Sequence, residues 1–151
     1  MPTEVRATVC NNTMKAIVQD KYGSHDVLNL VVIDRPLIIA DDEVLVRVHA
    51  AGVNWADWAI ARGVPYLFRM MFGGLRRPKS VIRGTDVAGT VEAVGKGVSL
   101  LSPGDKVFGW CEGAFAEYVC AEEDHFALKP SRLTFEQVQP CRWSVALRSR
   151  L

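Results

Sequence analysis

Short apolar stretches rich in branched residues make up most of the chain, and glycine or proline separates nearly all of them. The clearest stretch, residues 43–50 (EVLVRVHA), alternates valine with other residue types. Such alternation is typical of a β-strand that buries one face. Comparable stretches predict further strands at residues 14–18, 27–33, 88–94, 105–110, 114–121 and 126–128. The pattern therefore predicts a mainly β domain.

Helical patterns are few and short. Residues 54–61 (NWADWAIA) are rich in alanine, with Asn54 suited to cap the start of a helix and Gly63 placed just beyond its end. The spacing of Thr134 and Gln137 is that of a capping box, which predicts the start of a second helix. Many short strands with few helices indicate a barrel or a sandwich.

Composition and charge narrow the range of partners. The 151 residues are enough for one domain with its own core. The 18 Lys and Arg nearly balance the 17 Asp and Glu, so charge gives no argument for nucleic acid as a partner. No apolar run approaches the roughly 20 residues that span a bilayer, and residues 1–13 lack the apolar centre of a signal peptide. We therefore expect a cytoplasmic protein without a nucleic-acid or membrane partner, in which residues 1–13 are an N-terminal extension.

Five motifs occur in a fixed order along the chain, at residues 44–57, 83–95, 103–109, 113–119 and 129–137. Together they resemble the medium-chain dehydrogenase/reductase superfamily, and the resemblance covers about residues 14–137. It implies that these residues form the N-terminal substrate domain of that superfamily, a GroES-like, alcohol dehydrogenase-like and partly open β-barrel. The many short strands predicted from the alternation agree with such a barrel.

Two residues differ from the zinc-dependent members of that superfamily. Those members carry a cysteine in the Gly-Val-x segment and a histidine before the acid of the Gly-x-acid segment, and zinc prefers thiolate and imidazole ligands. Here the corresponding residues are Asn54 and Thr85, and Asp86 alone persists. The cysteine-rich loop that binds structural zinc in many relatives is also absent, and no Cys-x-x-Cys pair occurs. We therefore expect no metal site and no zinc.

The remaining pattern is similar to that of the zinc-independent quinone oxidoreductase-like enzymes. That resemblance implies transfer of hydride from NADPH to a quinone or another conjugated carbonyl. Without a metal, hydrogen bonds must polarise the carbonyl, and Asn54 is the candidate catalytic donor. Asn54, Asp57 and Tyr66 are the candidate substrate-binding residues. Each has a structural alternative: a helix cap for Asn54, structural hydrogen bonds for Asp57 and packing for Tyr66.

The end of the chain does not continue the resemblance. No glycine fingerprint of a Rossmann domain follows Gln137, and too few residues remain for a βαβ unit. Residues 138–151 (VQPCRWSVALRSRL) form an atypical tail, explained either by a shifted reading frame or by an authentic divergent end. We therefore expect a truncated domain that is inactive alone and does not bind NADPH well. Its cofactor-binding residues are unknown, and we expect self-association through the exposed interdomain face.

Two other functions compete with this interpretation. One is a stand-alone GroES-like interaction module that binds a protein partner, against which the reductase motifs argue. The other is a fragment of a zinc alcohol dehydrogenase, which Asn54 and Thr85 disfavour.

Overall fold

The computed structural model describes residues 12–64 and 81–138. Within these ranges the chain forms seven strands, one α-helix and two 3₁₀ turns. In chain order they are β1 (Thr13–Gln19), η1 (His25–Val27), β2 (Leu28–Asp34), β3 (Glu43–Gly52), α1 (Trp55–Arg62), β4 (Asp86–Val94), β5 (Lys106–Trp110), β6 (Tyr118–Glu122), η2 (Glu123–His125) and β7 (Phe126–Leu128). The predicted mainly β domain is confirmed.

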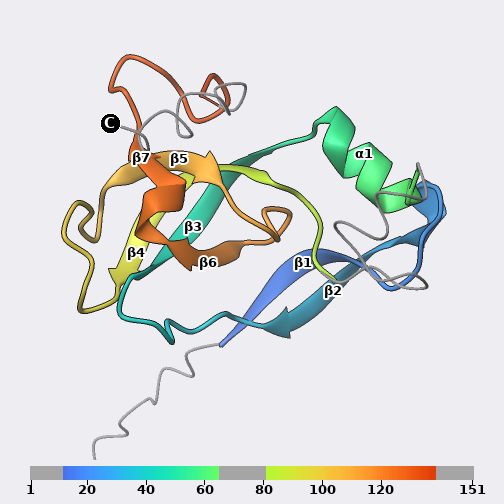
Figure 1. The fold of residues 1–151 in the computed structure, drawn as a ribbon, viewed down its shortest axis with the longest axis horizontal. Helices are drawn as coiled ribbons and strands as arrows, with labels where there is room; N and C mark the ends of the chain where they lie inside the picture. The colour runs from blue at the N-terminus through green and yellow to red at the C-terminus, as the bar shows by residue number, and fades with distance from the viewer. Residues whose placement is uncertain (1–11, 65–80, 139–151) are drawn as a thin grey trace, which may run out of the picture.

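The strands form two antiparallel sheets (Figure 1). The larger has five strands in the order β6-β3-β4-β5-β7, and the smaller is a ribbon of β1 and β2. Isolated bridges from Ala16 to Ala116 and from Val18 to Ile82 tie β1 to the segments that precede β6 and β4 in the larger sheet. The described strands therefore form a partly open barrel rather than a closed one, as the GroES-like resemblance implies.

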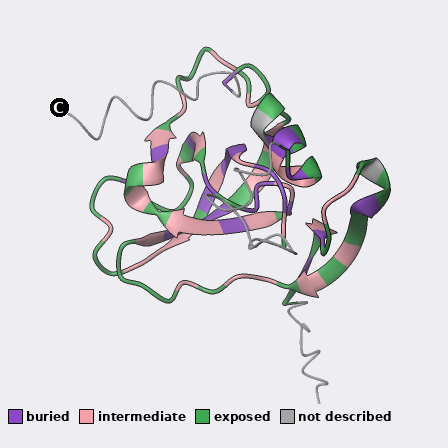
Figure 2. Ribbon diagram, turned by 45° about the vertical axis from the view of Figure 1, so that its right-hand side comes forward, coloured by how far each residue is buried: buried purple, intermediate pink, exposed green. Residues whose placement is uncertain are grey.

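Branched residues from the larger sheet fill the main core. The buried members of this cluster are Val44, Val46, Val87, Val91, Leu101, Val107, Cys111, Ala114, Val119 and Phe126. A second, smaller cluster joins β1 to the residues before β6 and contains Met14, Ala16 and Ala116. Figure 2 shows buried residues concentrated on the inner strands, whereas the β1–β2 ribbon carries exposed positions along its length.

The strand predicted at residues 114–121 is present, but its predicted first residue is wrong. The observed strand β6 begins only at Tyr118. Before it, Phe115 N–H donates to the Arg83 carbonyl and Glu117 N–H donates to the Lys15 carbonyl. Glu117 still accepts a hydrogen bond from Val48 N–H of β3, but the bonds of Phe115 and Glu117 to other segments interrupt the regular ladder. The alternation of residue types does not reveal them.

The predicted second helix start is present only as a local hydrogen-bond pattern. Thr134 N–H donates to Gln137 Oε1 at 2.9 Å, and Gln137 N–H donates to Thr134 Oγ1 at 3.3 Å. These are the two bonds of a capping box. Residues 135–137 form a turn, and the residues after 138 lie outside the described range.

Glu123 holds the loop before β5. Its carboxylate accepts hydrogen bonds from the consecutive backbone N–H groups of Ser99, Leu100 and Leu101, the last at 3.0 Å. Three converging N–H groups form a site for an anion, and here the chain supplies that anion itself. The loop is thereby fixed against η2.

We expect Glu123→Ala to destabilise the protein by about 1–3 kcal/mol, because three backbone donors lose a charged acceptor. The free energy of unfolding in urea measures the loss, and hydrogen exchange at Leu100 and Leu101 should accelerate more than elsewhere. Glu122→Ala is the matched control, since Glu122 is exposed and its neighbour makes the contact. Equal losses in the two variants would contradict the prediction.

Candidate functional site

Helix α1 begins at the candidate catalytic residue. Asn54 lies in extended conformation before the first turn, and its Oδ1 accepts a hydrogen bond from Asp57 N–H at 3.1 Å. Asp57 Oδ2 in turn accepts from Asn54 N–H at 2.9 Å, which completes a capping box. The helix ends at Gly63, whose φ of 63° is the left-handed conformation that favours glycine. The predicted cap and the predicted end are both confirmed.

The pairing of β3 with β4 brings Asn54 to the Gly84-Thr-Asp86 segment. Gly52 is paired with Asp86, so the residues after β3 and before β4 emerge at the same end of the sheet. Asn54 Nδ2 donates to Asp86 Oδ2 at 2.8 Å and to Thr85 Oγ1 at 3.0 Å. Thr85 Oγ1 donates to Asp57 Oδ1 at 3.3 Å. The four side chains therefore form one polar network, which we call the Asn54 network.

The Asn54 network leaves a buried acceptor and no spare amide hydrogen. A side-chain amide has two N–H hydrogens, and both of those on Asn54 have partners. Asp57 and Asp86 are each only 7% exposed. Asp86 Oδ1 is buried and has no hydrogen-bond partner among the described residues. In this arrangement the network offers a ligand an acceptor, Asp86 Oδ1. Asn54 has to give up one of its two hydrogen bonds before it can donate to a ligand.

Buried ionisable groups lie around the network. Burial lowers the pKa of the Arg83 guanidinium, and Tyr22, Glu112 and Asp57 oppose this shift electrostatically. Burial also raises the pKa of the Cys111 thiol to about 12. Cys111 is therefore a neutral thiol at physiological pH.

The residues at the expected zinc position do not fit zinc. They supply an amide, a hydroxyl and a single carboxylate, whereas zinc sites in proteins use thiolate, imidazole and carboxylate ligands. Asn54 could ligate a cation only through Oδ1, and that atom already accepts a hydrogen bond from Asp57 N–H. We derive no chemistry through a metal at this position.

The described residues do not form a Rossmann-type dinucleotide site. Every strand pair among them is antiparallel, whereas a Rossmann dinucleotide site uses a parallel βαβ unit. Pyrophosphate binds at a free helix N-terminus, and the start of α1 is occupied by its own Asn54 and Asp57 side chains. The start of α1 therefore offers no free backbone donor at Asn54 or Asp57 to a pyrophosphate.

Sequence reasoning missed two exposed tryptophans on α1. Trp55 and Trp58 are both exposed, with ring centroids 6.5 Å apart, and the Arg62 guanidinium lies 5.0 Å from the Trp58 ring. Their spacing of three residues on a predicted helix was the available signal. Tyr66, the third candidate substrate residue, lies outside the described residues.

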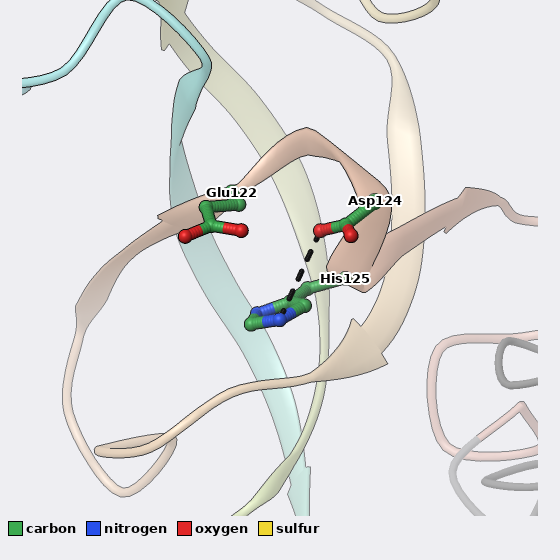
Figure 3. Close-up of side chains that lie close together, drawn as sticks. All are labelled: Glu122, Asp124 and His125. Atoms are coloured by element: carbon green, nitrogen blue, oxygen red, sulfur yellow. Dashed lines mark ion pairs between the residues drawn. The ribbon is translucent and has the colours of Figure 1, made fainter. Parts of the chain in front are cut away.

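A second polar cluster lies at the turn between β6 and β7 (Figure 3). One ligand-type atom from each of Glu122, Asp124 and His125 lies within 4.8 Å of the others, and His125 Nε2 is 3.8 Å from Asp124 Oδ1. The two acids are exposed, and His125 stacks on Trp110 with ring centroids 4.8 Å apart. Exposed groups of this kind are common without a cation, and the cluster shares no residue with the Asn54 network.

In the part of the chain that the structure describes, no helix has the length and apolar character needed to cross a bilayer.

Within the described residues, the antiparallel, partly open barrel and the capped helix α1 define a GroES-like domain, and comparison with known families agrees. Residues 40–131, more than half of the chain, match the alcohol dehydrogenase GroES-like domain family. The chain therefore belongs to the alcohol dehydrogenase GroES-like domain family, within the medium-chain dehydrogenase/reductase superfamily.

Several of the relatives are named as oxidoreductases. The chain is 36% identical over 126 residues to a quinone oxidoreductase of Sus scrofa, covering 82% of this chain and 36% of the relative. It is 35% identical to an NADPH-dependent alkenal/one oxidoreductase of Arabidopsis thaliana, covering 82% and 33%. The solved structure of the quinone oxidoreductase from Coxiella burnetii superposes with a TM-score of 0.75 at 31% identity, covering 87% of this chain and 42% of that one. The chain thus spans about a third of the length of these curated relatives.

Proposed function

We propose that residues 14–137 are the substrate domain of a zinc-free, NADPH-dependent quinone or enone oxidoreductase, and that this chain is inactive by itself. The Asn54 network is the observation behind the proposal. At the positions that hold zinc ligands in zinc-dependent relatives, this chain has residues that hydrogen-bond to one another. The names of the relatives support the reaction class. We further propose a cytoplasmic location. We also propose that residues 139–151 of the predicted tail at residues 138–151 do not belong to the domain, whereas Val138 is only 1% exposed and is counted with the domain.

In this proposal Asn54 is the donor that polarises the substrate carbonyl. One of its two hydrogen bonds then has to be exchanged for the bond to the substrate. The bond to Thr85 is the one to exchange, because Thr85 is neutral and 3.0 Å away, whereas the bond to Asp86 is 2.8 Å long and charge-assisted. Asp57 holds Asn54 in place through the capping box, and Tyr66 would form a wall of the substrate pocket.

A quinone titration tests the proposed substrate class. Tetramethyl-1,4-benzoquinone suits the experiment because its ring has no free position for addition of the Cys120 thiol. We expect ¹⁵N–¹H spectra to show shifts of the Asn54 side-chain amide and the Thr85 backbone amide, whereas NADPH added alone leaves the spectrum unchanged. An unaffected Asn54 amide, with shifts only at distant residues, would refute the assignment of Asn54. Tight binding of NADPH would refute the assignment of this chain as the substrate half.

Elemental analysis tests the proposed absence of zinc. We expect protein expressed in zinc-supplemented medium to carry far less than one zinc per chain, because the amide and hydroxyl ligands are poor ones. The double variant Asn54→Cys/Thr85→His is the matched comparison, since it restores a thiolate and an imidazole beside Asp86. One zinc per chain in the unmodified protein, lost on Asp86→Ala, would contradict the proposal.

A further inference from the structure

Asp86 is a buried carboxylate with one oxygen unpaired. The residue is only 7% exposed, and its Oδ2 accepts a hydrogen bond from Asn54 Nδ2 at 2.8 Å. Oδ1 of the same carboxylate is buried and has no hydrogen-bond partner among the described residues. The ion pairs between described residues do not involve Asp86. A buried acceptor without a donor is costly, so a ligand that brings a donor to Oδ1 would be favoured.

The neighbouring Asp57 shows how a hydroxyl satisfies such an acceptor. Thr85 Oγ1 accepts a hydrogen bond from Asn54 Nδ2 at 3.0 Å and donates one to Asp57 Oδ1 at 3.3 Å. One hydroxyl therefore connects the amide donor to a buried carboxylate. At Asp86 the same amide and a second carboxylate are present, but no hydroxyl of the described residues connects Asn54 to Oδ1.

The pair of Asn54 and Asp86 is complementary to a hydroxyl rather than to a carbonyl. Because Asp86 Oδ1 shares its carbon with the oxygen that Asn54 contacts, the amide donor and the unpaired acceptor lie close together. A hydroxyl oxygen can accept from Asn54 and donate to Asp86, whereas a carbonyl oxygen can only accept. A bound carbonyl would therefore leave Oδ1 unpaired. Asn54 and Thr85 are partly exposed, so the network is accessible from their side.

We infer that the Asn54 network binds an aromatic hydroxyl more tightly than the corresponding carbonyl, and that Asp86 sets this preference. The identity of the ligand rests on the proposed function, under which the two forms are a quinone and the hydroquinone made from it by addition of two electrons and two protons. Asp86 is then a specificity-determining residue that accepts from the hydroquinone O–H, while Asn54 donates to the same oxygen. The ligand replaces Thr85 as the second acceptor of Asn54.

Separate titrations of the two forms test this preference. Tetramethyl-1,4-benzoquinone and tetramethylhydroquinone are added to the unmodified chain without oxygen, and ¹⁵N–¹H shifts of the Asn54 side-chain amide give each Kd. We expect the hydroquinone to bind at least about tenfold more tightly, because a hydrogen bond to a charged acceptor contributes about that factor or more.

Asp86→Asn should abolish or reverse the preference. If Asn54 still donates to the side-chain oxygen of residue 86, the introduced amide nitrogen takes the place of Oδ1 and presents N–H groups to the ligand. A carbonyl then accepts from both amides, so we expect the quinone to bind at least as tightly as the hydroquinone. Glu122→Gln is the matched control, because it makes the same chemical change at an exposed carboxylate outside the network. The control should keep the preference of the unmodified chain.

The outcomes separate this inference from the proposed function. If both forms shift the Asn54 amide but bind equally, or if the quinone binds more tightly, the preference is refuted and the proposed function stands. If neither form shifts the Asn54 amide, both are refuted. A preference for hydroquinone that persists in Asp86→Asn would refute the role of Asp86. Circular dichroism establishes that the variants are folded, and if Asp86→Asn does not fold, the ratio of the two affinities in the unmodified chain decides.

Discussion

Gly89→Ala is expected to destabilise the fold by roughly 3 kcal/mol or more, because a Cβ atom at this position meets main chain rather than a movable side chain. The added carbon would lie 2.1 Å from the Arg47 carbonyl oxygen and 2.8 Å from Val46 Cγ1. Gly89 is paired with Val48 in β3 and with Val107 in β5, so neither neighbouring strand can move without breaking the sheet. Unfolding in urea, followed by tryptophan fluorescence, measures the loss.

Gly97→Ala is the matched control for this substitution. Its Cβ would lie 3.2 Å from the Asp41 carbonyl oxygen, in a loop that can yield by a few tenths of an ångström. We expect a loss of no more than about 1 kcal/mol there. Equal stability of the two glycine variants would show that the close approach of β3 and β4 does not require glycine at position 89.

Asn54→Ala is expected to cost about 3 kcal/mol, since it removes a helix cap worth about 1 kcal/mol and leaves buried polar partners unsatisfied at about 1–3 kcal/mol. Thr85 and Asp86 both lose the amide that donates to them. Thr134→Ala is the control, because it removes a capping residue at an exposed turn with no such network. We expect the control to lose less than half as much.

Asn54→Asp separates the cap from the network. Aspartate is as good a cap as asparagine, but it places a carboxylate where the amide donated to Asp86 at 2.8 Å. In the folded variant the carboxylates of residues 54 and 86 would lie side by side, whereas in the unfolded chain they are far apart. Their repulsion raises the pKa of the folded pair above its unfolded value. The variant should therefore lose stability as pH rises from 4 to 7, and recover much of it at the acid end. A pH-independent loss would indicate that Asn54 acts through the cap alone.

Much of the fold could be predicted from local pattern. Alternation in residues 43–50 is enough to identify β3, although the strand does not bury one face alone, since Leu45 is buried together with Val44 and Val46. Asn54 and Gly63 mark both ends of α1 by their capping chemistry. The start of β6 could not be predicted, because it depends on main-chain bonds from Phe115 to Arg83 that leave no trace in residue type.

The candidate site was predicted as a set of residues but not as a network. Asn54 is far from Thr85 and Asp86 along the chain, and only the register of β3 on β4 brings them together. Knowledge of the family suggested these positions as lost zinc ligands. It did not show that Asn54 uses both of its amide hydrogens on its neighbours, which changes how Asn54 has to act on a substrate.

The capping box at the start of α1 also limits how this site can change during evolution. Asn54 and Asp57 stabilise the helix with the same atoms that shape the site. A mutation that changes the polar groups of the site therefore also lowers the free energy of unfolding. A zinc-binding cysteine in place of Asn54 would remove the helix cap at the same time. Interconversion of zinc-free and zinc-binding chemistry on this scaffold should accordingly require a compensating stabilising mutation, so the two chemistries are separated by a stability barrier as well as by ligand identity.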